Sequence, residues 1–190
     1  MKRTAKSDSA ERGASLIEMM IALVVLAVGL IGSMVLVSIS IGGNYRARND
    51  STSAALAEMV AQRISAVPVC KSDCGAATSV NVTDCAGNVH TIDVAGTSTG
   101  SGADLTSSGK IDYTQSAGAV PAGYQMQYTV CAVKTGTQSN YDVRWNIKLL
   151  PSGDEQYVVV GTRMANSSQN DATVSAPAVN IRTVVGNDGN

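Results

Sequence analysis

The longest feature of the hydropathy pattern is an uncharged apolar run from Met19 to Ile41. About 20 apolar residues are enough for a helix to cross a bilayer, so the run predicts a membrane-spanning helix. A single carboxylate, Glu18, stands at its start. An acid carried to the bilayer centre costs roughly 2.5–3.5 kcal/mol on insertion scales, and an acid beside such a helix is therefore a candidate functional residue.

The second periodic segment covers residues 45–67, where apolar side chains recur at intervals of three and four residues. This spacing predicts an amphipathic helix that ends just before Pro68. Either the helix continues directly from the apolar run, or Gly42 and Gly43 bend the chain between the two. The apolar positions are Leu56, Met59, Val60, Ile64 and Val67.

After Pro68 the pattern changes to a period of two, which is typical of strands. Residues 151–154, Pro-Ser-Gly-Asp, predict a turn that joins two of the strands as an antiparallel hairpin. The Gly/Ser/Thr-rich residues 96–109 are expected to form a flexible loop. A long N-terminal helix, half transmembrane and half amphipathic, packed against an antiparallel sheet is an α+β fold. The expected strands are residues 80–83, 89–94, 125–133, 141–149, 156–164 and 179–185.

Composition and charge limit the function classes. The 190 residues provide one modest domain besides the apolar run. Residues 1–13 are basic, with a net charge of about +2, and the remainder of the chain is slightly acidic. The chain has no clustered basic face of the kind that binds nucleic acid. Positive charge tends to remain in the cytoplasm, which predicts a cytoplasmic N-terminus, although Arg46 and Arg48 on the far side weigh against it.

Four cysteines follow the apolar run: Cys70, Cys74, Cys85 and Cys131. An even number beyond a membrane span predicts two disulfides in an oxidising compartment. A zinc site is disfavoured, because the first pair has three residues between its members and the only histidine, His90, lies in a separate predicted strand. Cys131 lies within a strand and needs a partner on a neighbouring element. We favour Cys85–Cys131 with Cys70–Cys74, and a Cys74–Cys85 bridge remains an alternative.

Residues 12–23, Arg-Gly-Ala-Ser-Leu-Ile-Glu-Met-Met-Ile-Ala-Leu, resemble the class III signal of type IV prepilins and pseudopilins. The resemblance implies that a prepilin peptidase cuts between Gly13 and Ala14 and that Ala14 is then N-methylated. Glu18 becomes the fifth mature residue. Residues 24–32, Val-Val-Leu-Ala-Val-Gly-Leu-Ile-Gly, resemble in particular the minor pilins called PilV. The family usually has Phe at the first mature position, and many major pilins have a proline where this chain has Val35.

The resemblance implies a domain organisation and a cellular setting. Residues 1–13 are the leader, 14–43 the transmembrane and assembly helix, 44–67 its amphipathic continuation, and 68–190 a β-rich head on the periplasmic or extracellular side. The expected partners are other minor and major pilins, the prepilin peptidase and the inner-membrane assembly platform. The protein is expected in the inner membrane, with its C-terminal domain in the periplasm, and then in the filament at the cell surface.

Catalytic and cofactor chemistry is not expected from the sequence. His90 alternates with Val89 and Thr91 in a predicted strand, and no G-x-S-x-G motif supplies a nucleophile. Gly109-Lys110 lacks the remainder of a P-loop, and the aspartates match no calcium loop. The sequence therefore predicts no enzyme activity, no cofactor, no metal site and no small-molecule substrate.

Three functions stay open. The first is a minor pilin of a type IV pilus, which primes or caps the filament. The second is a minor pseudopilin of a type II secretion system. The third is a single-pass membrane protein whose exported domain binds a partner. A secretory signal peptide fits poorly, because its apolar core is only ~7–15 residues long and ends in a small-residue cleavage site.

Overall fold

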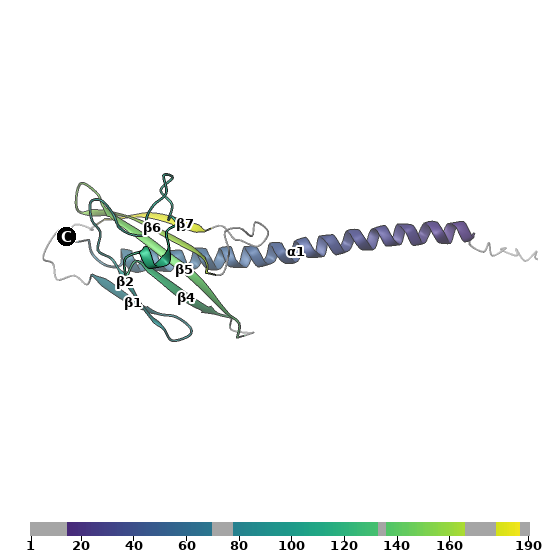
Figure 1. Cartoon of the computed structure of the whole chain (residues 1–190), viewed down its shortest axis with the longest axis horizontal. Coiled ribbons are helices and arrows are strands. Elements are labelled where there is room, and N and C mark those ends of the chain that lie inside the picture. Colours follow the sequence, from purple (N-terminus) through teal and green to yellow (C-terminus); the bar gives the residue numbers. More distant parts are fainter. Residues whose placement is uncertain (1–14, 70–77, 133–135, 166–177, 187–190) are drawn as a thin grey trace, which may run out of the picture. The chain divides into compact units, whose positions relative to one another are not determined.

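The computed structural model describes residues 15–69, 78–132, 136–165 and 178–186. The chain divides into two compact units, Met1–Asn44 and Tyr45–Asn190. One long helix, a short 3-10 helix (η1, Ala117–Ala119) and antiparallel strands make up the described secondary structure, in the α+β arrangement expected from the sequence (Figure 1).

The helix α1 comprises Leu16–Ser65 and is helical through Gly42 and Gly43. The amphipathic segment is therefore a direct continuation of the helix that contains the apolar run. The helix ends at Ser65, two residues earlier than expected. Because a residue that precedes proline avoids the helical conformation, the chain leaves the helix before Pro68.

The second half of α1 packs against the sheet with one face. Its buried residues recur at the three- and four-residue spacing that the sequence indicated. Tyr141 Oη donates a hydrogen bond to Asn49 Oδ1 (3.5 Å), which links the helix to the central strand of the sheet. The buried helical residues are Asn49, Ser53, Leu56, Ala57, Val60, Ala61 and Ile64.

In the part of the chain that the structure describes, seven strands follow the helix and form two sheets. The first is the hairpin of β1 (Ser79–Thr83) and β2 (Val89–Asp93). The second contains five strands in the order β3-β5-β6-β7, with β4 paired to β5 alongside β3. These strands are β3 (Ser101–Gly102), β4 (Gln125–Cys131), β5 (Gln138–Leu149), β6 (Glu155–Met164) and β7 (Val179–Gly186).

The predicted hairpin is confirmed between β5 and β6. Leu150 N–H donates to the Glu155 carbonyl (2.9 Å) and Gly153 N–H donates to the Leu150 carbonyl (2.8 Å), so the turn lies where the Pro-Ser-Gly-Asp sequence placed it. Gly153 has a φ of 72°. Glycine adopts this left-handed conformation without the steric cost that other residues incur.

The expectation of a flexible loop over residues 96–109 is wrong at Ser101–Gly102, which pair with Ile147 and Asn146 of β5 as strand β3. A Cβ atom added at Gly102 would lie 2.3 Å from the Trp145 carbonyl oxygen. Its φ of 107° is likewise unfavourable for other residues. Gly102 therefore allows the chain to run close beside the central strand.

The core lies between the second half of α1 and one face of the sheet. Tyr141, Val143, Trp145 and Ile147 alternate along β5 and are buried on this face. Antiparallel pairing places each of them opposite an alternate residue of β6. The opposite face of β5 carries polar residues, and the segment between β3 and β4 covers part of it, since Tyr113 Oη donates to the Asp142 carbonyl (3.2 Å).

Candidate assembly site

The first turn of α1 contains the predicted assembly residue. The Ser15 carbonyl accepts hydrogen bonds from Glu18 N–H (3.0 Å) and Met19 N–H (3.2 Å), so the helix begins immediately after Ser15. Glu18 is exposed. A carboxylate in the first turn interacts favourably with the partial positive charge at a helix N-terminus, and this local effect alone favours an acid here.

The other predicted N-terminal residues, Gly13 and Ala14, lie outside the described residues. Within residues 15–69, 78–132, 136–165 and 178–186, no Lys, Arg or His forms an ion pair with Glu18. The leader cleavage, the methylation of Ala14 and the ion pair of Glu18 therefore stay predictions.

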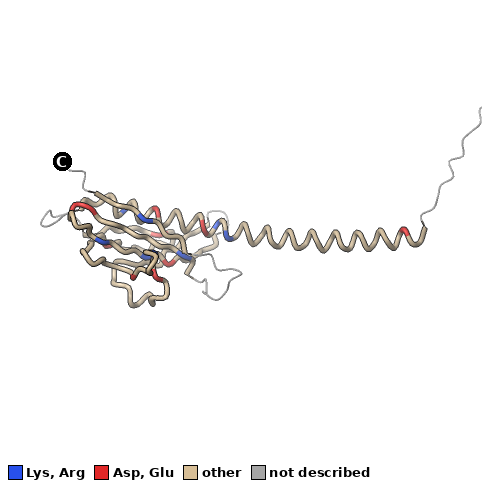
Figure 2. The backbone as a smooth tube through the Cα atoms, turned by 90° about the horizontal axis from the view of Figure 1, so that it is seen from above, with Lys and Arg blue, Asp and Glu red and all other residues tan. Residues whose placement is uncertain are grey.

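The first half of α1 is apolar on every side. Its large apolar side chains, from Leu16 to Ile41, are all at least 53% exposed in the isolated chain. By length and composition α1 is the one helix among the described residues that could cross a membrane. Its uncharged stretch, drawn in tan, is clear in Figure 2.

Two hydroxyl groups within this apolar half already have acceptors. Ser33 Oγ donates to the Leu30 carbonyl (2.8 Å), and Ser38 Oγ donates to the Met34 carbonyl (3.1 Å). Bonding within the helix removes the need for a partner outside it. Glu18 is the only ionisable side chain between Leu16 and Ile41.

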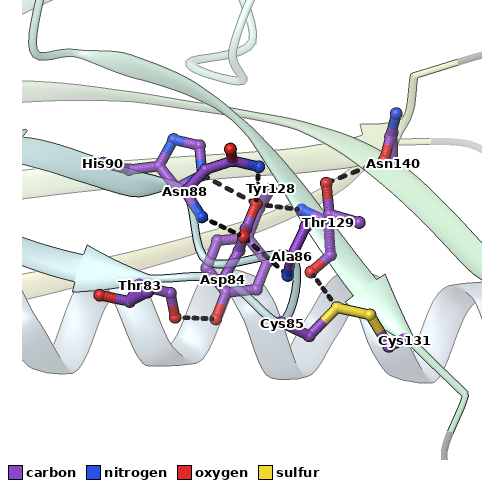
Figure 3. Close-up of a disulfide and its surroundings, with 10 residues drawn as sticks. All are labelled: Thr83, Asp84, Cys85, Ala86, Asn88, His90, Tyr128, Thr129, Cys131 and Asn140. Atoms are coloured by element: carbon purple, nitrogen blue, oxygen red, sulfur yellow. Dashed lines mark hydrogen bonds and ion pairs between the residues drawn. A yellow bond between two sulfur atoms is a disulfide. The ribbon is translucent and has the colours of Figure 1, made fainter.

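The structure contains the disulfide Cys85–Cys131, which is the pairing favoured from the sequence. It connects the β1–β2 turn to the end of β4 (Figure 3). Cys85 N–H also donates to the Thr129 carbonyl (3.4 Å). Cys70 and Cys74 lie outside the described residues, so the Cys70–Cys74 pairing stays a prediction.

Next to the disulfide, the Asp84 carboxylate is buried and holds the same two elements together (Figure 3). Its Oδ1 accepts from the backbone N–H groups of Ala86 (3.0 Å) and Asn88 (2.8 Å). Its Oδ2 accepts from Asn88 Nδ2 (3.0 Å) and from Thr129 N–H in β4 (3.3 Å). His90 Nε2 lies 3.1 Å from the same oxygen.

These contacts determine the charge state of Asp84. Burial raises the pKa of the carboxyl group, but the hydrogen bonds from Asn88, His90 and Thr129 outweigh it and hold the pKa well below its ordinary value. Asp84 therefore remains ionised at neutral pH. Its role in this arrangement is to fix the β1–β2 turn on the edge of β4.

A second polar cluster lies on the face of β5 opposite the helix. Arg144 is buried and donates from Nε and Nη2 to the two carboxylate oxygens of Asp142 (2.9 and 2.8 Å). Its Nη1 donates to the Gln115 carbonyl (2.6 Å). The guanidinium carbons of Arg144 and Arg163 lie 5.0 and 4.4 Å from the centroid of the Tyr113 ring. Burial first, and then the nearby Asp142 charge, raise the pKa of Tyr113.

Both clusters are internally bonded and fasten loops to the sheet. Among the described residues, no group of three or more His, Cys, Asp or Glu side chains could hold a metal ion. Sequence reasoning had assigned Asp84 and His90 no shared role. The role of Asp84 could have been predicted from residues 84–88, Asp-Cys-Ala-Gly-Asn, which lie between two predicted strands. Asp and Asn side chains commonly form hydrogen bonds with the backbone of a turn.

A comparison with known protein families finds a match in the N-terminal part of the chain. A model described as the prokaryotic N-terminal methylation motif matches residues 8–34. No curated protein and no solved structure matches the chain. The matched residues include Gly13, Ala14, Glu18 and the first part of the apolar run. Together with the membrane-length helix, this motif supports a type IV pilin-like or pseudopilin-like protein. Proteins of this class are structural subunits rather than enzymes. They associate with a membrane and assemble with other pilins.

Proposed function

We propose that the chain is a minor pilin of a type IV pilus, resembling the PilV type, which co-assembles with other pilins to prime or cap the filament. In this proposal residues 1–13 are the leader and 14–43 the transmembrane and assembly helix. Residues 44–67 are its amphipathic continuation, and 68–190 are the periplasmic or extracellular head.

The observation that carries the proposal is the isolated position of Glu18. It is the only charged residue of α1 before Arg46, on a half-helix whose apolar side chains are exposed all round. Such a surface is stable only in lipid or against other apolar helices. A carboxylate in that environment needs a cation close by.

Cleavage after Gly13 supplies this cation. It creates a positively charged amine at Ala14, four residues before Glu18 and therefore about one helical turn away. When helices of neighbouring subunits pack together, the amine of one subunit is available to the Glu18 carboxylate of the next. The ion pair sets the axial register, and the apolar side chains provide cohesion without specifying register.

The proposed location follows from charge. The basic leader favours a cytoplasmic N-terminus in the inner membrane, and the head is then periplasmic until the subunit enters the filament. The disulfide Cys85–Cys131 in the head is consistent with an oxidising compartment. The prepilin peptidase and the inner-membrane assembly platform are the partners before assembly, and major and minor pilins are the partners afterwards.

The second candidate is a minor pseudopilin of a type II secretion system, which shares the processing signal and the helix. A deletion strain separates the two. Loss of surface filaments or twitching supports the pilus, whereas loss of protein secretion with normal filaments supports the secretion system. A membrane-anchored binding module is the third candidate, and it predicts that residues 1–13 are retained.

The assembly role is tested by replacing Glu18 in the full-length chain. We expect Glu18→Val to be processed normally but to be depleted from sheared filaments or from minor-pilin complexes, because the Ala14 amine then has no carboxylate partner. Glu18→Asp retains the charge and is the matched control. Recruitment of Glu18→Val at the wild-type level would contradict the ion-pair mechanism.

A further inference from the structure

The two long edges of the five-stranded sheet differ. One edge is formed by β3 and β4, which lie alongside β5, and the other edge is β7. β7 comprises eight residues, Val179–Gly186, and contains no proline. An open strand of this length presents a row of unpaired backbone groups, and natural proteins usually block such edges.

The backbone hydrogen bonds of the central strand show which backbone groups of β7 are open. Trp145 N–H donates to the Tyr124 carbonyl (3.1 Å), and its carbonyl accepts from Ala103 N–H (2.9 Å), so its backbone groups point away from β6. Antiparallel pairs alternate between bonded and non-bonded. Val160, opposite Trp145, therefore bonds to Ile181 of β7.

The same alternation extends along β7. The backbone groups of Val179, Ile181, Thr183 and Val185 point toward β6, and those of Asn180, Arg182 and Val184 point away from it. Among the described residues, no backbone hydrogen bond involves the N–H or C=O groups on the outward side. β7 thus offers three consecutive outward positions for pairing.

Side-chain burial indicates that this edge of the core is incomplete. On the helix side of the sheet, Val158 and Val160 of β6 are fully buried. Their partners on β7, Thr183 and Ile181, are only partly buried. On the opposite face, Val184 is 56% exposed. A further strand beside β7 would cover apolar surface on both faces of the sheet.

The β4 edge is closed by contrast. Thr129 directs its backbone groups away from β5, and there its N–H donates to Asp84 Oδ2 (3.3 Å) while its carbonyl accepts from Cys85 N–H (3.4 Å). The disulfide Cys85–Cys131 fastens this cover covalently. The β1–β2 turn therefore prevents strand addition at the β4 edge. At β7 the described segment before β4 bonds only to side chains: Asn180 Oδ1 accepts from Ile111 N–H (2.9 Å), and Arg182 Nη2 donates to the Ser108 carbonyl (2.6 Å). The outward backbone groups of β7 have no hydrogen bond to a described residue.

We propose that β7 receives an extended segment of a different subunit of the assembly, which adds as a further strand of the sheet. This inference rests on the proposed function, which places the head among other pilin subunits. The incoming segment alternates apolar and polar residues and places an acidic residue opposite Arg182. A second copy of this chain is the poorer occupant, because β7–β7 pairing about Arg182 brings like charges together and the β4 edge is closed.

The test uses Val184, whose N–H points outward and whose side chain is exposed. Val184→Pro removes one edge donor without removing a bond to β6, whereas Val184→Thr retains both the donor and the β-branched shape. Each full-length variant replaces the wild type in its own cells. We measure the fraction of processed chains recovered in sheared filaments, or in complexes crosslinked in the membrane.

We expect Val184→Pro to reduce the recovered fraction roughly tenfold, because one hydrogen bond is lost and the proline ring clashes with the incoming strand. We expect Val184→Thr to change the recovered fraction less than about twofold. Thermal unfolding of both variants in detergent stays at the wild-type temperature. Equal recovery of Val184→Pro and wild type would overturn the proposal. Because only processed chains are counted, failure of leader cleavage is recorded separately as a failure of the proposed function.

Hydrogen exchange distinguishes the possible occupants. We expect the amides of Asn180, Arg182 and Val184 to exchange quickly in the detergent-solubilised chain and slowly in the assembly. Slow exchange already in the dilute solubilised chain would show that the chain covers its own edge, and would overturn the proposal. Protection that appears only as the concentration of the pure chain rises would identify a second copy and would overturn the choice of occupant.

Discussion

The two halves of α1 belong to one helix but have different surfaces. In residues 16–41 the apolar side chains surround the helix, and none is buried by the chain itself. In residues 45–65 they form one stripe, which includes Val60 and Ile64 and is covered by the sheet. A one-sided stripe specifies packing within the chain, whereas an all-round apolar surface specifies packing against lipid or other chains.

The largest effects are expected when a buried valine in the second half of α1 and an exposed valine in the first half are each replaced by aspartate. Val60→Asp places a carboxylate without a partner in the core and should destabilise the head by at least about 4 kcal/mol, enough to prevent stable folding. Val28→Asp should leave the head folded but weaken membrane insertion by roughly 2.5–3.5 kcal/mol. Near-ultraviolet circular dichroism in detergent and membrane fractionation measure the two effects.

Val→Thr at both positions is the matched control, since it retains the shape of the side chain without introducing a charge. If Val28→Asp unfolded the head, or if Val60→Asp left it folded, the distinction between the two halves would be wrong.

The next effect concerns the disulfide, which stabilises the head alone. Replacing Cys85 and Cys131 together by Ser should cost the head about 2–5 kcal/mol, because the unfolded chain is no longer constrained by the crosslink. Thermal unfolding of the full chain in detergent, without reductant, measures the loss. Membrane association should not change, and an unchanged unfolding temperature would show that the crosslink contributes little to the head.

A smaller effect is expected from Asp84 and depends on pH. Because hydrogen bonds lower its pKa in the folded chain, Asp84 stabilises the head fully above its ordinary pKa of about 3.9. This contribution is lost as the pH falls from about 4 toward the lower folded-state pKa. The stability difference between wild type and Asp84→Asn should therefore shrink between pH 5 and pH 2 in denaturant titrations.

The direction of this change is the test. Asp112, whose pKa is lowered mainly by Thr114, provides a second case: the stability difference between wild type and Asp112→Asn should shrink with falling pH in the same direction. A difference between wild type and Asp84→Asn that stayed constant with pH would contradict the ionised, bonded carboxylate.

The sequence predicted the helix and most strands well, but it did not predict which other segments cover them. The strands were recognised from alternation, as in β6, and the β5–β6 hairpin from its turn residues. Alternation alone does not show whether the second face of a strand is covered. Asp142 and Arg144 are on that face of β5 and are buried, because Tyr113 and Gln115 from a distant segment cover them.

Contacts between segments far apart in the sequence also explain why some bonds of Asp84 were not predicted. The bonds of Asp84 to Asn88 are local and follow from turn chemistry, whereas its bond to Thr129 depends on how the hairpin docks on β4. The β3 strand was missed because two residues carry no periodicity, and its position depends on Gly102 beside Trp145. The role of Glu18 stays a prediction, and it could be proposed from the sequence because the motif that contains Glu18 is one contiguous segment.

We propose that α1 functions after its leader has been removed, with Glu18 as the fifth residue of the mature chain. This processing is tested by mass spectrometry of the N-terminus of the protein isolated from membranes. We expect a chain that begins at Ala14 and carries one additional methyl group on its amine. A chain that retains residues 1–13 would contradict it.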